Sequence, residues 1–256
     1  MKKILLLIII FLNSCVIMND TSLYRSFHTF KIEHFDEYEK IRIDNNLTYL
    51  ETINMFNYPL YFVPHSYQSN ALFLNQTLCL VNTNHHLNSS YSSSNLCNVK
   101  EFNVKYIYRE DEEILLDCQA LKALEKMMMD MEKEGLTVYL YSGYRSYQKQ
   151  ITIYNEATNK NEVASPGCSE HQTGLAVDIS TLNDGLSYYF SQSKEYMWLI
   201  NNSYKYGFIL RYPLDKTDIT GYIYEPWHYR YVGIDATKIK NEMTLEEYLF
   251  KNFELE

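Results

Sequence analysis

An aspartate inside an otherwise apolar segment constrains this chain more than any other feature. Asp178 stands between Val177 and Ile179 in the run LAVDI, and such a run predicts a buried strand. A buried carboxylate costs several kcal/mol unless a cation compensates its charge. The fold must therefore bring a cationic partner to this strand, and a metal ion is the best candidate.

Two histidines are candidate ligands for that ion. His171 precedes Asp178 in SEHQTGLAVD, and His228 lies further along in EPWHYR. Two imidazoles and one carboxylate are the ligands of a catalytic zinc site with an open fourth position, whereas a structural site would use cysteines. Taken singly, a histidine in a strand is more often a core residue, and a buried aspartate can cap a turn. The three residues together favour zinc.

Glu225 is the candidate general base. In a regular strand Glu225 and His228 would face opposite sides, but Pro226 between them predicts a local bend. The bend would place the Glu225 carboxylate beside the metal and within reach of the attacking water, although a glutamate here could also only keep an edge strand soluble. Zinc lowers the pKa of water toward roughly 7, and Glu225 would carry the proton to the leaving amine.

Arg145 is the candidate anchor for a substrate carboxylate. It lies in SGYRSYQKQ, after a predicted strand end and a glycine turn, where side chains project into a cleft. A guanidinium holds a carboxylate with two parallel hydrogen bonds, and a peptidase that removes only C-terminal residues needs such a grip. An arginine on its own more often forms a surface ion pair.

The remaining segments predict an α+β fold, because helices and strands are mixed without a regular β-α-β rhythm. We expect one or two short helices over 35–56 and a polar surface loop over 84–98. Further helices are expected from near 111 to a cap at Gly135, from Ser146 to 159, over 193–206 with Gly207 at the end, and last with a capping box of Thr244 and Glu247. Strands are expected over 136–143, over 174–180, and in FILRY and YIYEPWHYRYVG.

The N-terminus has the order of an export signal. Two lysines precede nine apolar residues, a run shorter than the roughly 20 that span a membrane. The sequence LNSC resembles a bacterial lipobox, in which Cys15 would be acylated, and an uncleaved signal anchor is the alternative. We expect a signal and lipobox over 1–15, a tether with a small helical and β segment over 16–75, and the catalytic domain over 76–256.

Charge and cysteine content exclude several classes of protein. A net charge of −9 and the lack of a basic cluster beyond Lys2-Lys3 exclude a nucleic-acid partner. No C-x-x-C pair is present, so a cysteine zinc site or a thioredoxin-like motif is not expected. An exported chain could oxidise some thiols, and Cys79 with Cys97 is the only pairing that we consider. Buried free thiols are the default.

Five segments in order and spacing resemble the VanY-type D-alanyl-D-alanine carboxypeptidases, which are zinc peptidases of bacterial cell-wall metabolism. The resemblance covers about residues 76–256, and its pattern S-x-H-x(6)-D followed by E-x-W-H is highly specific. It implies the α+β fold shared with the hedgehog signalling domain, with a central, mainly antiparallel sheet flanked by helices. The segments are SGYRSYQKQ, SPGCSEHQTGLAVDI, YGFILRYP, TGYIYEPWHYRYVG and TLEEYL.

The resemblance also implies a role for each site residue. Zinc would be held by His171, Asp178 and His228, with Glu225 as the base. The substrate's C-terminal end would be contacted by Arg145, Gln150 and Ser169, of which Gln150 and Ser169 rest on the resemblance alone.

The expected function is that of an exported, lipid-anchored bacterial zinc carboxypeptidase, monomeric and acting at the outer surface of the cell membrane. It would trim the terminal D-alanine from peptidoglycan stem peptides. An L,D-carboxypeptidase, a D,D-dipeptidase or a wall endopeptidase could use the same machinery, because the subsite walls decide among them. A non-catalytic wall-binding or zinc-binding lipoprotein is the alternative of another class, and it would have lost the base or a ligand.

Overall fold

The structure, a computed structural model, describes residues 21–27, 30–57, 69–110 and 112–252. The predicted signal segment and Cys15 lie outside these ranges. Within them, no helix is long and apolar enough to span a membrane. The helices are α2 (Phe35–Asn45), α3 (Tyr49–Asn57), α4 (Cys118–Lys133), α5 (Tyr147–Glu156), α6 (Lys194–Asn202), α7 (Thr217–Thr220), α8 (Ala236–Ile239) and α9 (Leu245–Asn252).

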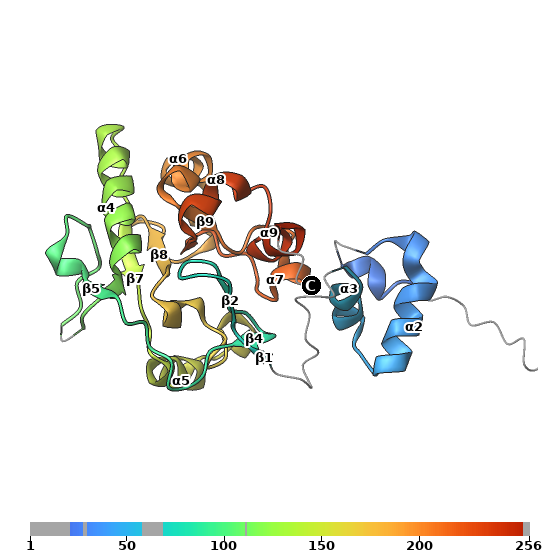
Figure 1. The fold of residues 1–256 in the computed structure, drawn as a ribbon. Helices are drawn as coiled ribbons and strands as arrows, with labels where there is room; N and C mark the ends of the chain where they lie inside the picture. Colours follow the sequence, from blue (N-terminus) through green and yellow to red (C-terminus); the bar gives the residue numbers. More distant parts are fainter. Residues whose placement is uncertain (1–20, 28–29, 58–68, 111, 253–256) are drawn as a thin grey trace, which may run out of the picture.

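One four-stranded sheet organises the larger part of the protein (Figure 1). Its strand order is β7-β8-β10-β9, and every neighbouring pair is antiparallel, which confirms the predicted α+β fold. The remaining strands form two-stranded sheets. The strands are β1 (Ser69–Asn70), β2 (Leu72–Phe73), β3 (Cys79–Leu80), β4 (His85–His86), β5 (Leu96–Asn98), β6 (Leu115–Asp117), β7 (Tyr139–Ser142), β8 (Ala176–Ser180), β9 (Phe208–Leu210) and β10 (His228–Tyr231).

β8 lies in the middle of the sheet and all five of its residues are buried. Val177 and Ile179 belong to the main apolar cluster, together with Leu121 and Leu124 of α4. Because side chains alternate along a strand, Asp178 points to the opposite face. The two faces of β8 therefore have different tasks: one packs against apolar side chains, and the other presents a carboxylate.

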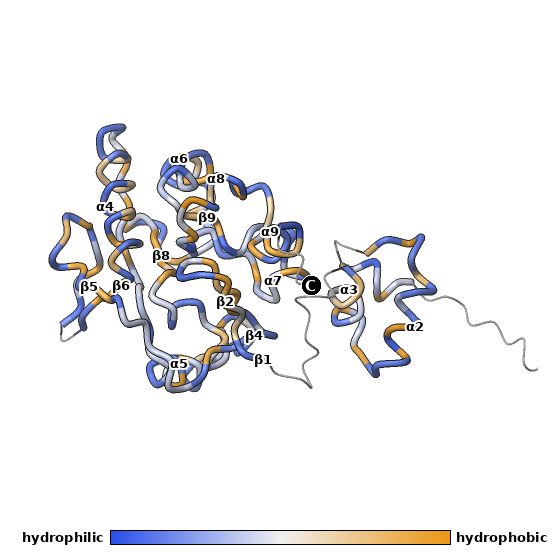
Figure 2. The backbone as a smooth tube through the Cα atoms, in the orientation of Figure 1, coloured by the Kyte–Doolittle hydropathy of each residue, from blue (hydrophilic) through white to orange (hydrophobic). Residues whose placement is uncertain are grey.

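The helix predicted from near residue 111 begins only at Cys118. Residues Leu115–Asp117 form β6, antiparallel to β5, and Asp117 then accepts hydrogen bonds from two backbone N–H groups of the first turn of α4. The prediction was wrong because an apolar residue at Ile114 fits a helical spacing and a strand equally well. Figure 2 shows the hydrophobic and hydrophilic segments that alternate along α4.

Several predicted helix ends are confirmed. Ser146 caps α5 through its hydroxyl, which accepts from the backbone N–H of Lys149 at 3.2 Å. Gly207 ends the turn after α6 in a left-handed conformation, with φ of 87°. The capping box of Thr244 and Glu247 is formed in both directions, at 2.7 and 3.1 Å.

The segment over 84–98, predicted as a loop, contributes β4 and β5.

The cysteine pairing differs from the one that we considered. Cys97 of β5 forms a disulfide with Cys118 at the start of α4, and Cys79 is a buried free thiol, as is Cys168. The pairing of β5 with β6 brings Cys97 opposite Leu116, close to the first residue of α4. This neighbourhood depends on strand pairing and has no local signature in the sequence.

The N-terminal helices α2 and α3 confirm the helical segment predicted over 35–56. They enclose a small aromatic cluster that includes Tyr24, Phe35 and Tyr38 and that is separate from the other apolar clusters. Figure 1 shows this part (blue) beside the rest of the protein, and α3 contacts α7.

Candidate active site

Strand register brings together two of the three predicted ligands. In the antiparallel pairing of β8 with β10, Asp178 lies directly opposite His228. Paired residues in antiparallel strands point to the same face, so their side chains meet. Nδ1 of His228 is 3.0 Å from Oδ1 of Asp178, and both side chains are buried.

A glycine-containing turn before β8 supplies the third ligand. His171 lies in a 3-10 turn over Glu170–Thr173, which ends at Gly174 in the left-handed region, with φ of 75°. Nε2 of His171 is 3.2 Å from Oδ2 of Asp178, and its Nδ1 is 2.7 Å from the carbonyl oxygen of Gly143. Gly143 is required there, because a Cβ would approach the Leu115 carbonyl oxygen to 2.4 Å.

The three side chains fit a divalent metal ion. One ligand atom from each of His171, Asp178 and His228 lies within 4.8 Å of the others, and all three residues are buried. Nε2 of His171 has no hydrogen-bond partner among the described residues. Its Nδ1 faces a carbonyl oxygen, which accepts a hydrogen bond from Nδ1–H and leaves Nε2 as the ligand atom. Two nitrogens and a carboxylate with an open side are the donors of a catalytic zinc site.

Burial and neighbouring charges shift the pKa values of these groups in different directions. Burial, assisted by Arg145, lowers the pKa of His171 to about 4. Burial also acts to lower the pKa of His228, but the carboxylates of Asp178 and Glu170 outweigh it and raise that pKa to about 9. Burial alone would raise the pKa of Asp178, yet the two histidines hold it well below its usual range. A metal ion would displace the proton from His228, because imidazole ligands bind in the neutral form.

Glu225 precedes β10 in the bend that Pro226 predicts. The backbone N–H of His228 donates to the carbonyl oxygen of Glu225 at 3.1 Å, which closes a turn with the proline at its second position. The turn carries the Glu225 carboxylate back toward the ligands, where Oε2 is 3.6 Å from Nδ1 of His228. Burial raises the pKa of Glu225 to about 7, against the opposing effect of His228. A carboxylate with such a pKa exchanges protons near neutral pH.

The three residues predicted to contact the substrate lie around the same site. Arg145 follows β7, and its NH1 donates to Oε1 of Gln150 at 3.1 Å. Its NH2 is 3.7 Å from Oδ2 of Asp178, and its Nε has no hydrogen-bond partner in the described ranges. Nε is therefore available to a carboxylate oxygen, and NH2 on the same edge faces Asp178. Gln150 and Ser169 are both buried.

All seven predicted site residues line one cavity of about 180 Å³. An adjoining hollow of about 600 Å³ shares Arg145 and Asp178 with it. Sequence reasoning missed several residues of the cavity wall, which include Glu170, Leu186, Tyr212, Tyr222 and Trp227. Glu170 has no local signal: the sequence shows two arginines, Arg211 and Arg230, that would require a buried countercharge, but only the fold shows that Glu170 is their partner.

Comparison with known proteins finds several carboxypeptidases similar to this chain. A family model described as VanY, D-alanyl-D-alanine carboxypeptidase, matches residues 113–234. The Bacillus subtilis protein YodJ is 44% identical over 186 residues, which are 68% of this chain and 67% of the relative. A D-alanyl-D-alanine carboxypeptidase of Enterococcus faecalis is 44% identical over 52% of this chain, which spans about half (55%) of that relative. The bifunctional dipeptidase and carboxypeptidase VanXYC of Enterococcus gallinarum is 34% identical over 67% of this chain and 93% of its own length.

Solved structures share this fold. The L,D-carboxypeptidase LdcB is 41% identical, with a TM-score of 0.61 over 66% of this chain and 84% of its own. The vancomycin-resistance D,D-pentapeptidase VanY, solved with Zn(II), is 36% identical, with a TM-score of 0.54 over 68% of this chain and 99% of its own. VanYB in complex with D-alanine-D-alanine is 34% identical, with a TM-score of 0.55 over 70% of this chain and 100% of its own.

Proposed function

Because the chain belongs to the VanY family of D-alanyl-D-alanine carboxypeptidases, we propose that it is a zinc peptidase that removes the C-terminal D-alanine from peptidoglycan stem peptides. The observation that carries the proposal is the single cavity lined by the three ligand candidates, Glu225 and Arg145. The cavity thus offers a candidate for each part of a carboxypeptidase: a metal site, a proton carrier and an anchor for the terminal carboxylate.

Arg145 holds the substrate by its terminal carboxylate. The hydrogen bond from NH1 to Gln150 fixes the guanidinium, and the edge formed by the unpaired Nε and by NH2, which also faces Asp178, matches the two oxygens of a carboxylate. Burial lowers the pKa of Arg145, and Asp178 offsets this effect only in part before the substrate binds; the substrate carboxylate would offset more of it. This grip places the last peptide bond at the metal site and excludes chains that continue past it.

Glu225 moves the proton. Its carboxylate takes a proton from the water that attacks the scissile carbonyl and delivers it to the nitrogen of the departing D-alanine. Zinc held by His171, Asp178 and His228 would polarise the carbonyl and make the water more acidic. The carbonyl of Gly143 keeps the proton of His171 on Nδ1, so that Nε2 remains a ligand.

Purified protein loaded with zinc tests the proposal, with pentapeptide and tetrapeptide stems as substrates and mass spectrometry of the products. Loss of one alanine from the pentapeptide is expected. Glu225→Gln should bind zinc with unchanged stoichiometry and turn over at least about 100-fold more slowly, because an amide cannot accept the proton. Near-normal turnover in this variant would remove Glu225 from the mechanism.

The tetrapeptide decides the alternative within the enzyme class. LdcB, which is named as an L,D-carboxypeptidase, supports an activity on tetrapeptide stems. Trimming of the tetrapeptide alone would move the assignment to L,D-carboxypeptidase, and release of a dipeptide to D,D-dipeptidase. Absence of any cleavage by zinc-loaded protein would favour an endopeptidase or a binding protein.

The N-terminal sequence supports a location outside the cell membrane with a lipid on Cys15. Labelled fatty acid should be incorporated into the expressed wild-type chain and not into Cys15→Ala. Equal labelling of both would contradict the lipid anchor.

A further inference from the structure

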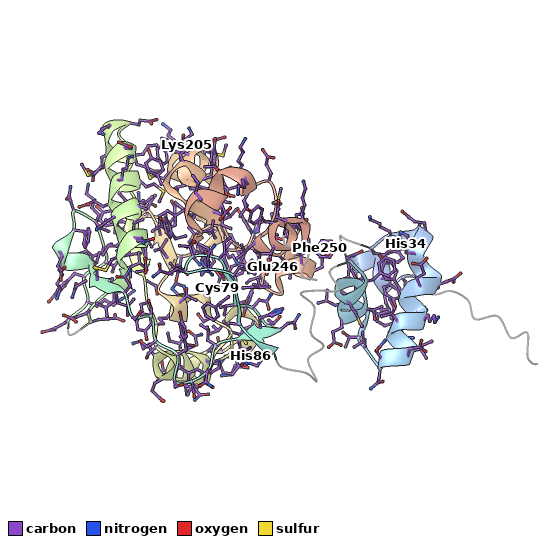
Figure 3. The ribbon with its side chains drawn as sticks, in the orientation of Figure 1. His34, Cys79, His86, Lys205, Glu246 and Phe250 are labelled. Atoms are coloured by element: carbon purple, nitrogen blue, oxygen red, sulfur yellow. A yellow bond between two sulfur atoms is a disulfide. The ribbon has the colours of Figure 1, made fainter. Side chains whose placement is uncertain are left out.

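A buried group of four charges lies behind His228, and the mechanism above does not use it. We call it the buried charge cluster; its members are Glu170, Arg211, Arg230 and Glu246. Two carboxylates and two guanidiniums balance each other without help from the metal site. Glu246, labelled in Figure 3, comes from α9, and Arg230 of β10 also reaches Cys79 of β3.

Both arginines use the same oxygen of Glu170. Nε of Arg211 donates to Oε1 at 2.8 Å, and NH1 of Arg230 donates to Oε1 at 2.7 Å. The second oxygen, Oε2, is buried and has no hydrogen-bond partner among the described residues. Glu170 is thus held firmly on one side and has a free acceptor on the other.

That free oxygen faces His228. Oε2 of Glu170 is 3.7 Å from Nε2 of His228, and Nε2 also has no hydrogen-bond partner in the described part of the chain. The distance is that of an ion pair and is longer than a hydrogen bond. His228 and Arg230 are two residues apart in β10, so their side chains lie on the same face and meet Glu170 together.

The two histidines then have matching surroundings. Nδ1 of His171 faces the carbonyl of Gly143, and Nε2 of His228 faces Glu170, while the other nitrogen of each ring faces Asp178. A metal-ligating histidine usually gives its second N–H to such an acceptor, which fixes the tautomer and the ring orientation. We propose that Glu170 is a positioning residue for His228: its carboxylate keeps the ring proton on Nε2 and so leaves Nδ1 as the ligand atom. This inference rests on the proposed zinc site.

Glu170→Gln tests the proposal because the arginines dictate how the amide must lie. Two donors on one oxygen require an acceptor, so the amide oxygen would face the arginines and the NH₂ would face His228. Nε2 would then have to accept, and the proton would move to Nδ1, which could no longer bind a metal. We expect zinc affinity to fall by roughly 10- to 100-fold, measured by competition with a chromophoric chelator.

Glu246→Gln is the matched control. It removes the same charge from the same cluster. Glu246 binds Arg211 through both oxygens, at 2.9 and 2.6 Å, and forms no hydrogen bond or ion pair with His228 among the described residues. Its zinc affinity should stay near that of the wild type. The absorption spectrum of the cobalt-substituted protein should change in Glu170→Gln and not in Glu246→Gln.

Several outcomes would overturn the inference. Wild-type zinc affinity in Glu170→Gln, or an equal loss in both variants, would reduce Glu170 to a countercharge for the arginines. If Glu170→Gln does not fold, the ring ¹⁵N spectrum of zinc-loaded wild-type protein decides, and a His228 proton that is absent from Nε2 or unprotected from exchange would refute the role. Failure of the wild type to bind zinc would overturn the proposed function and this inference with it, whereas zinc binding without peptidase activity would leave only the inference standing.

Discussion

Arg145 should set the requirement for a free C-terminus. We expect Arg145→Ala to lower kcat/KM on a pentapeptide stem by roughly 10- to 100-fold, since hydrogen bonds to a charged group contribute about 1.5–3 kcal/mol. The same variant should lose little on a stem whose C-terminus is amidated, because the amide offers no carboxylate to hold. Steady-state kinetics on the two substrates measures the difference.

Arg109 provides the control for this prediction. It lines the adjoining hollow, but its NH1 is engaged with Glu112 and the Tyr141 carbonyl. Arg109→Ala should keep the preference for the free acid. An equal loss on both substrates in Arg145→Ala would contradict the proposed grip.

The predicted site residues and the missed ones differ in what marks them in the sequence. Asp178 stands out because its neighbours are apolar, and His228 and Glu225 stand out because they lie beside each other near a proline. Glu170 carries no such mark, since its role depends on arginines 41 and 60 positions away. Local chemistry can be read along the chain, but partners joined only by the fold cannot.

The disulfide between Cys97 and Cys118 joins β5 to the start of α4, where Asp117 also caps the helix. The two cysteines are 21 positions apart, and a cross-link that closes a loop of this length lowers the conformational entropy of the unfolded chain. We expect Cys97→Ser combined with Cys118→Ser to reduce the free energy of unfolding by about 3 kcal/mol. Denaturant unfolding followed by circular dichroism measures the change.

Reduction of the wild-type protein is the control. Reductant should destabilise the wild type to the level of the double variant and leave the double variant unchanged. A wild-type protein that is insensitive to reductant would show that this bridge does not contribute.

Capping residues were predicted more reliably than the shortest strands. Ser146, Gly207 and Thr244 act within a few residues of themselves, so their capping roles are visible locally. β5 and β6 contain three residues each and exist through their pairing. A strand this short has too little pattern to distinguish it from a loop or from the first turn of a helix, as residues 115–117 illustrate.

The free energy of unfolding should depend on pH differently in metal-free protein and in zinc-bound protein. The pKa of His228 is raised to about 9 in the folded protein, against an ordinary value near 6.5 in the unfolded chain. The stabilisation that protonated His228 contributes to the folded protein is therefore complete below pH 6.5 and is lost as pH rises through 9. Glu225, with a pKa raised to about 7, acts in the same direction. Metal-free protein should lose roughly 2–3 kcal/mol between pH 7 and 9.

Zinc should abolish this loss, because the metal binds His228 without its proton at every pH in this range. Denaturant unfolding at pH 7 and 9, with chelator and with excess zinc, makes the comparison. Metal-free protein that is as stable at pH 9 as at pH 7 would contradict the raised pKa of His228.

The fold class could be predicted from the sequence, but the arrangement of the parts could not. Mixed helices and strands indicated α+β, and the four-stranded antiparallel sheet agrees with it. The strand order β7-β8-β10-β9 places β10 between β8 and β9, although β9 comes between β8 and β10 in the chain. Such an order follows from which apolar faces can be covered together, and this is a property of the assembled protein.

Because Asp178 pairs with His228 across β8 and β10, zinc bound to both side chains would favour the correct register of these two strands during folding. A slip of one residue between the two strands would turn one ligand to the other face of the sheet and dismantle the site. Zinc bound to the correctly aligned sheet would stabilise that alignment by mass action and leave the slipped forms without this gain. Chains that fold with zinc present should therefore reach the native register in higher yield than chains that fold with chelator.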